Sequence, residues 1–184
     1  IFKIFYFAEE LSAPWGSIFK SKQVWASVFA KTAGSFGYYL MLTKLPSYLD
    51  SVFGVSISSN GMLNSGINLA CALSMVTAGP LSLYLCKFIS RTRIRKNFAI
   101  ISILGPAICI LLIPQFDCNS LIVIILLFIA MFLYGFMTGG EWPIISEFAP
   151  AFSGTVFGVA NTPSMATGFL APIVVGIFLD QNVM

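Results

Sequence analysis

One lysine stands alone among apolar residues, and its neighbours would make a site for an anion. Lys31 is the only charged residue well inside an apolar run. On a helix, Ser35 at i+4 and Tyr38 at i+7 share its face, so a cation, a hydroxyl and a phenol would point the same way. The competing interpretation is that the Lys31 side chain stretches along the helix to the polar surface of a membrane. Both interpretations stay open at this point.

A second group of polar side chains surrounds a proline near the end of the chain. Asn161 and Thr162 precede Pro163, and Ser164 and Thr167 lie just beyond it. Proline removes a backbone hydrogen bond from a helix, and polar, broken helices are typical of the substrate sites of secondary transporters. We therefore interpret Asn161 and Thr162 as candidate binding residues. For Ser164 and Thr167 we prefer the simpler interpretation that small polar residues pack helices together.

Two carboxylates, Glu141 and Glu147, flank Trp142 and Pro143. Their predicted position is a cytoplasmic loop that follows an apolar run. A carboxylate at such a border can carry a proton or hold a gate closed, whereas the alternative is a solvated loop charge. We interpret Trp142 as an anchor at the membrane interface.

The composition of the chain indicates that these residues lie on membrane-spanning elements. The chain is 58% hydrophobic and 9% charged, and its mean hydropathy is +0.91. Ordinary soluble domains carry roughly 25% charged residues. Too few charges remain here to cover the exterior of a water-soluble protein of this size.

The absence of histidine excludes several kinds of active site. Without it, the chain has no Ser-His-Asp triad and no histidine-ligated metal. An intramembrane enzyme would need a catalytic pair such as two buried aspartates, and no apolar run carries one. The cysteines show no Cys-x-x-Cys spacing; they are Cys71, Cys86, Cys109 and Cys118. We expect no enzyme, no cofactor, no metal site and no disulfide.

Five apolar runs are long enough, or nearly so, to cross a bilayer, whose core takes about 20 helical residues. They are residues 24–45, 61–86, 98–113, 121–138 and 155–179. We expect Pro46 to end the first helix and Pro80 to kink the second. The short third run gains length if Arg95 and Lys96 extend toward the headgroups. Because the runs do not alternate polar and apolar residues, a transmembrane barrel is excluded and we predict an all-α polytopic transmembrane helix bundle.

Basic residues predict the orientation of the bundle. Eight fall on one side of the predicted spans: Lys3, Lys20, Lys22, Lys87, Arg91, Arg93, Arg95 and Lys96. The opposite side has none unless Lys44, at the border of the first span, is counted. Since basic loops stay in the cytoplasm, we predict a cytoplasmic segment at 1–23, a membrane domain at 24–179 and an extracytoplasmic tail at 180–184. The same rule explains the basic excess without nucleic acid as a partner.

Several motifs resemble a known family of carriers. They are PWGSIFKSKQVWA (14–26), LTKLPSYLDSVFGVSISSNGML (42–63), LGPA (104–107) and EFAPAFSGTVFGVANT (147–162). In order and spacing they resemble the C-terminal half of the anion:cation symporter family of the major facilitator superfamily. That family includes sialin, the type I sodium/phosphate cotransporters and the vesicular glutamate transporters. The resemblance covers most of residues 14–179.

The chain departs from this family pattern at several positions. The family has an acidic residue near the cytoplasmic end of its helix eight, which the run at 61–86 resembles, and this chain has Leu83 there. This replacement puts a gating contact of the family in doubt. Ile144 and Ile145 replace an Asn-His pair, although Glu147 keeps the acidic position that follows. The glutamate carriers have an arginine where this chain has Gly34. Glutamate is therefore not the substrate we expect.

The resemblance implies five of the six helices of one half of a carrier, with the N-terminal half as a missing partner. It also implies ion-coupled symport of phosphate- or sialate-like anions by alternating access, driven by protons or sodium, in a plasma, vesicular or lysosomal membrane. Lys31, Tyr38, Tyr39, Asn161 and Thr162 would contribute to the substrate site. The alternative is a truncated membrane protein that does not transport.

Overall fold

The computed structural model of the chain describes residues 13–54, 57–116 and 119–181. Predictions that involve Lys3, Cys118 or residues 182–184 lie outside this part. The described residues form helices and no strand, which confirms the predicted all-α fold. With η for 3-10 helices, the elements are α2 (Trp15–Lys20), α3 (Lys22–Phe53), α4 (Ile57–Leu85), α5 (Arg91–Leu112), η1 (Ile113–Gln115), α6 (Ser120–Tyr134), η2 (Gly135–Thr138), α7 (Glu141–Phe148), η3 (Pro150–Phe152) and α8 (Ser153–Gln181).

The five long helices overlap the five predicted runs, and the end of the first and the start of the third differ most from the prediction. α3 continues through Pro46 and ends at Phe53. Gly54 caps it with a φ of 60°, the left-handed conformation that commonly ends helices. Proline removes only one backbone hydrogen bond, and the buried side chains of Leu45 and Leu49 hold this part of α3 in the core. α5 begins at Arg91, so the basic residues before the third run are helical.

The fourth predicted run ends in a close approach between backbones. α6 passes into η2, and two glycines, Gly139 and Gly140, lead from η2 into α7. A Cβ atom at Gly139 would lie 2.5 Å from Cδ1 of Phe98, and one at Gly140 would lie 2.5 Å from the α5 backbone. Only glycine lets the chain pass so close to α5. Glu141 and Glu147 therefore lie on a helix, and the prediction that they lie in a loop was wrong.

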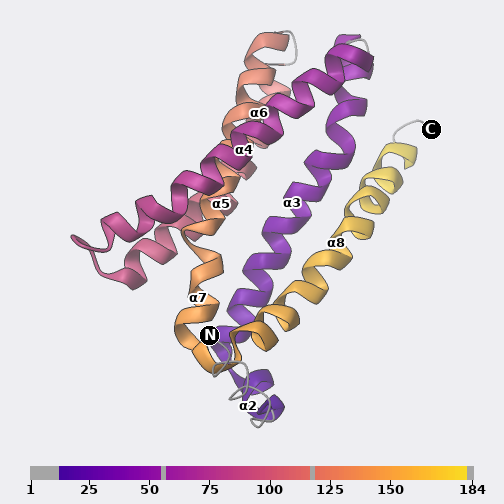
Figure 1. The fold of residues 1–184 in the computed structure, drawn as a ribbon. Helices are drawn as coiled ribbons and strands as arrows, with labels where there is room; N and C mark the ends of the chain where they lie inside the picture. Colours follow the sequence, from indigo (N-terminus) through magenta and orange to yellow (C-terminus); the bar gives the residue numbers. More distant parts are fainter. Residues whose placement is uncertain (1–12, 55–56, 117–118, 182–184) are drawn as a thin grey trace.

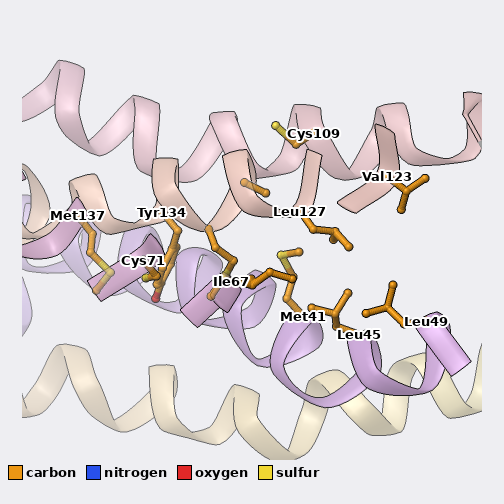
Figure 2. Packing of buried hydrophobic residues seen from close by; sticks show 12 residues of the cluster. Met41, Leu45, Leu49, Ile67, Cys71, Cys109, Val123, Leu127, Tyr134 and Met137 are labelled. Carbon is orange, nitrogen blue, oxygen red and sulfur yellow. The ribbon is translucent and has the colours of Figure 1, made fainter. Parts of the chain in front are cut away.

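The main hydrophobic core lies between α3, α4, α5 and α6, as Figure 2 shows. Its buried side chains are Met41, Leu45, Leu49, Ile67, Cys71, Cys109, Val123, Leu127, Ala130, Met131, Tyr134 and Met137. A smaller core joins α2 and the start of α3 to α7 and α8. It consists of Ile18, Val24, Val28, Ile145, Val156 and Ala160. Because Ile145 belongs to this smaller core, α7 is held against α3 and α8 and its first residue is positioned inside the bundle.

Four segments of the described chain are long and apolar enough to cross a membrane. They are Ser59–Leu85, Arg91–Gln115, Ser120–Phe148 and Pro150–Phe178. α3 is not among them although it has 32 residues, because Lys31, Lys44 and several hydroxyl side chains lower its hydropathy. It runs beside α8 in Figure 1. The assignment of α3 as a membrane span therefore stays a prediction.

Candidate functional site

Lys31 and Glu141 form an ion pair inside the bundle. Lys31 lies on α3 and Glu141 is the first residue of α7, and Nζ of the lysine is 3.7 Å from Oε1 of the carboxylate. Only 4% and 7% of the two side chains are exposed. Among the described residues, Oε1 of Glu141 has no hydrogen-bond partner. The pair is therefore held by charge attraction at a distance too long for a hydrogen bond.

Two aromatic rings lie against the ammonium group of Lys31. Its Nζ atom is 4.3 Å from the ring centroid of Phe157 on α8 and 5.5 Å from that of Trp142 on α7. Aromatic faces attract cations within about 6 Å. The lysine side chain thus points toward α7 and α8 instead of stretching to the membrane surface. Trp142, predicted only as an interface anchor, also covers this buried charge.

The predicted polar face of α3 is divided between two neighbouring helices. The hydroxyl of Ser35 lies 2.6 Å from that of Ser164 on α8, and both residues are buried. Tyr38 instead stacks on Tyr134 of α6, with ring centroids 5.1 Å apart and an interplanar angle of 13°. Lys31 and Ser35 therefore face α8, whereas the phenol ring of Tyr38 packs toward α6.

The other predicted binding residues lie on α3 and α8 in different settings. Tyr39 donates a hydrogen bond from its hydroxyl to the sulfur of Met165 at 3.3 Å. Thr162 is exposed, and its hydroxyl donates to a carbonyl of its own helix at 3.0 Å. Asn161 is half-buried and follows Phe157 by four residues, so it shares the face of α8 that reaches Lys31. Of the α8 candidates, Asn161 is the one whose position suits the site around Lys31.

Arg95 is a candidate that the sequence reasoning missed. It was expected to extend toward the headgroups, but it is 5% exposed. Its Nε and Nη2 donate to Oε1 of Glu147 at 3.1 and 2.8 Å, and its Nη1 donates to Oγ of Ser82 at 2.9 Å and to the carbonyl of Gly139 at 2.7 Å. One guanidinium therefore joins α4, α5 and α7. Ser82, the neighbour of Leu83, supplies the contact on α4. The acidic residue retained at the start of the motif at 147–162, Glu147, was the signal in the sequence that could have pointed to this contact.

A cavity of about 510 Å³ lies between α3, α5 and α7. Its wall contains two carboxylates, Glu141 and Glu147, and two cations, Arg95 and Lys96. Small-molecule sites commonly occupy about 300–1,000 Å³. Glu141, the partner of Lys31, thus borders a space that could hold a small charged molecule.

Comparisons with known proteins relate this arrangement to carriers. Residues 6–172 match the Major Facilitator Superfamily. Sialin of Ovis aries is 29% identical over 95% of this chain and 36% of its own length. An uncharacterized transporter of Caenorhabditis elegans is 33% identical over 89% and 34%, and vesicular glutamate transporter 3 of Danio rerio is 28% identical over 91% and 29%. The resemblance seen in the sequence is confirmed, and the chain spans about a third of the length of these relatives.

Proposed function

Because the chain belongs to the Major Facilitator Superfamily, we propose that it forms part of a secondary active transporter of small anions. In this proposal it supplies five helices of the C-terminal half, and an N-terminal half supplies the other side of the substrate site. The substrates are phosphate- or sialate-like anions, and a gradient of protons or sodium drives them across. The name of the vesicular glutamate transporters refers to glutamate, but Gly34 disfavours that substrate here.

The buried ammonium of Lys31 is the observation that carries this proposal. A buried cation that has lost its hydration water attracts an anion strongly. The present partner of Lys31 is the carboxylate of Glu141, and many organic anions carry the same group. An incoming anion therefore competes with Glu141 for Lys31. Asn161 would supply a hydrogen bond to the molecule bound at Lys31. The hydroxyls of Thr162, Tyr38 and Tyr39 remain candidate ligands on the same two helices, and they would have to leave their present contacts to reach it.

Glu141 can couple the anion to a proton. Protonation removes the charge of its carboxylate, which leaves the Lys31 ammonium without a partner until an anion binds. Proton and anion would then enter the site together. Other charged groups of the same cavity are Arg95, Lys96 and Glu147, so the field at Glu141 depends on them as well. If sodium drives transport instead, Glu141 keeps only the competing role.

Glu147 and Arg95 are proposed to form a gate. Their hydrogen bonds join α5 to α7 at the end of the bundle that carries most basic residues. We propose that this end faces the cytoplasm, as the positive-inside rule predicts. Breaking the contact would let α7 separate from α5 and open the cavity, a rigid-body change of the kind that alternating access needs.

Uptake into proteoliposomes tests the proposal. The full-length protein that contains this chain would be reconstituted, and uptake of labelled phosphate and sialic acid would be measured under a proton or a sodium gradient. Hydrogen bonds to charged groups contribute about 1.5–3 kcal/mol, so Lys31→Gln should raise the KM for the anion about 10- to 100-fold. Lys22→Gln, an exposed lysine on the same helix, is the matched control and should leave KM unchanged.

Two results would contradict parts of the proposal. Unchanged uptake by Lys31→Gln, at an equal amount of protein in the membrane, would remove Lys31 from the substrate site. No anion uptake by the unmodified protein under either gradient would favour a membrane protein that does not transport. The same assay in plasma-membrane and lysosomal fractions would identify the compartment.

A further inference from the structure

A short basic segment joins two of the helices that are apolar enough to cross a membrane. Residues 86–90 link α4 to α5, and the candidate spans Ser59–Leu85 and Arg91–Gln115 lie on either side of them. In Figure 1 the end of α4 and the start of α5 project from the side of the bundle, away from α8. Because both flanking helices have the length and composition of membrane spans, we expect residues 84–93, the basic connection, at the level of the lipid headgroups.

Three exposed cations of the basic connection have no carboxylate partner. They are Lys87, Arg91 and Arg93. Both ion pairs formed within the described part of the chain belong to other cations. The sequence has no aspartate or glutamate at positions 51–116, so no acidic residue of α4 or α5 balances the three charges. An exposed cluster of one sign attracts partners of the opposite sign.

The start of α5 adds to this positive field. The N-cap residue, Ser90, makes no side-chain hydrogen bond to the helix, and the first turn contains no acidic residue. The positive end of the α5 dipole therefore lies beside Arg91 and Arg93 without a compensating charge. Side chains and helix end have the same sign here, and together they favour an anionic partner.

Exposed apolar side chains beside the cations indicate what kind of anion fits. Tyr84, Phe88 and Ile89 are 56%, 71% and 45% exposed. The rings of Tyr84 and Phe88 meet edge to face with centroids 5.5 Å apart, and Nζ of Lys87 lies 5.6 Å from the centroid of Tyr84. Aromatic rings are common at membrane interfaces, where basic side chains reach the headgroups. A lipid offers both an anionic and an apolar part, whereas a free anion offers only the first.

We propose that the basic connection binds the headgroups of anionic phospholipids. Lys87, Arg91 and Arg93 contact the acidic groups of the lipid, and the aromatic pair lies against the apolar part just beneath them. In the orientation proposed above these lipids belong to the cytoplasmic leaflet, whose surface is negatively charged. The binding itself does not depend on the proposed transport function.

Native mass spectrometry of the purified full-length protein in detergent tests this surface without any transport. The protein would be titrated with phosphatidylserine and, separately, with phosphatidylcholine of the same acyl chains, to obtain a Kd for each. A basic residue near an anionic lipid surface contributes about fivefold in affinity. Arg91→Gln/Arg93→Gln should therefore raise the Kd for phosphatidylserine about 25-fold and leave that for phosphatidylcholine unchanged. Both side chains are exposed, so the variant should fold.

Two further variants separate this surface from a general effect of charge. Lys20→Gln/Lys22→Gln also removes two exposed cations, and as the matched control it should keep the Kd for phosphatidylserine. Phe88→Ala should raise the Kd of both lipids by a similar factor, because the ring contacts the part that they share. Added ammonium acetate should weaken only the binding of phosphatidylserine, since salt screens exposed charges.

The proposal is overturned if the unmodified protein binds both lipids with equal Kd, or if Arg91→Gln/Arg93→Gln keeps the Kd for phosphatidylserine. An equal loss in Lys20→Gln/Lys22→Gln would overturn it too, because net charge and not this surface would be responsible. Displacement of phosphatidylserine by inorganic phosphate would identify a soluble anion as the ligand and reject the lipid. Failure of anion uptake would contradict the proposed function and leave these measurements unaffected.

Discussion

Removing the lysine of the Lys31–Glu141 pair is expected to destabilise the bundle strongly. At 3.7 Å and an effective dielectric constant of about 20, two unit charges attract by about 4.5 kcal/mol. Both side chains are almost fully buried, so a single substitution leaves the other charge without a partner, which typically costs about 3–5 kcal/mol. Lys31→Met should therefore lower the free energy of unfolding by about 4 kcal/mol.

Glu141→Gln should lose less stability than Lys31→Met. After Glu141→Gln the ammonium of Lys31 keeps the ring of Phe157, 4.3 Å away. A desolvated cation–π contact contributes about 2 kcal/mol, so this variant should lose less stability than Lys31→Met. The double variant Lys31→Met/Glu141→Gln removes both charges and should recover most of the loss, because an apolar replacement of a buried pair is often neutral.

The assay is unfolding by sodium dodecyl sulfate in mixed micelles, followed by circular dichroism. The four proteins form a double-mutant cycle, from which we expect a coupling of about 2–4 kcal/mol. Lys22→Met, on the exposed start of α3, is the control and should change stability by less than about 0.5 kcal/mol. Additivity of the two single losses within about 0.5 kcal/mol would refute the reasoning, because the charges would then not stabilise each other.

Two further predictions concern the corner where α4, α5 and α7 meet. Arg95→Met should lower the free energy of unfolding by about 1–3 kcal/mol, because the buried hydroxyl of Ser82 and the carbonyl of Gly139 lose their donor, while Glu147, whose side chain is 38% exposed, is screened by solvent. Arg95→Lys should recover only part of this loss because an ammonium lacks the planar fork of donors. The same unfolding assay checks both variants, and equal stability of Arg95→Lys and the unmodified protein would contradict the hydrogen-bond geometry. Gly139→Ala should cost about 1–3 kcal/mol because its Cβ would lie 2.5 Å from Phe98. Gly158→Ala, whose Cβ would meet nothing within 4 Å, is the matched control and should be neutral or stabilising by up to about 1 kcal/mol. An equal change of stability in both glycine variants would refute the close approach to α5 as the cause of the loss at Gly139.

Much of the fold could be predicted from apolar runs, because each helix that crosses a bilayer needs about 20 apolar residues. The boundaries were less predictable. Pro46 was expected to end α3, but Leu45 and Leu49, which lie before and after it, pack in the core and the helix continues to Phe53. α7 was not predicted, because eight residues with two carboxylates resemble a loop until their burial against α3 and α8 is known.

The candidate site was predictable only in part. Lys31 could be recognised because a lone charge in an apolar run needs a partner or a cavity. Its partner could not be identified, since Glu141 lies 110 residues further along the chain. Arg95 was misjudged for a related reason: basic residues at the end of a run usually lie at the membrane surface, and only the packing of α4, α5 and α7 shows that this one is buried.

The sequence by itself determined that this chain is an all-α membrane protein with a single charge deep in an apolar run. These properties depend on composition and on the period of the helix, which are local. Tertiary structure alone decided that Lys31 pairs with Glu141 against the ring of Phe157 and that Arg95 joins three helices. Such contacts join residues far apart in the chain, and they form because a buried charge or polar group has no water to bind and must find its partner on whichever helix packs against it.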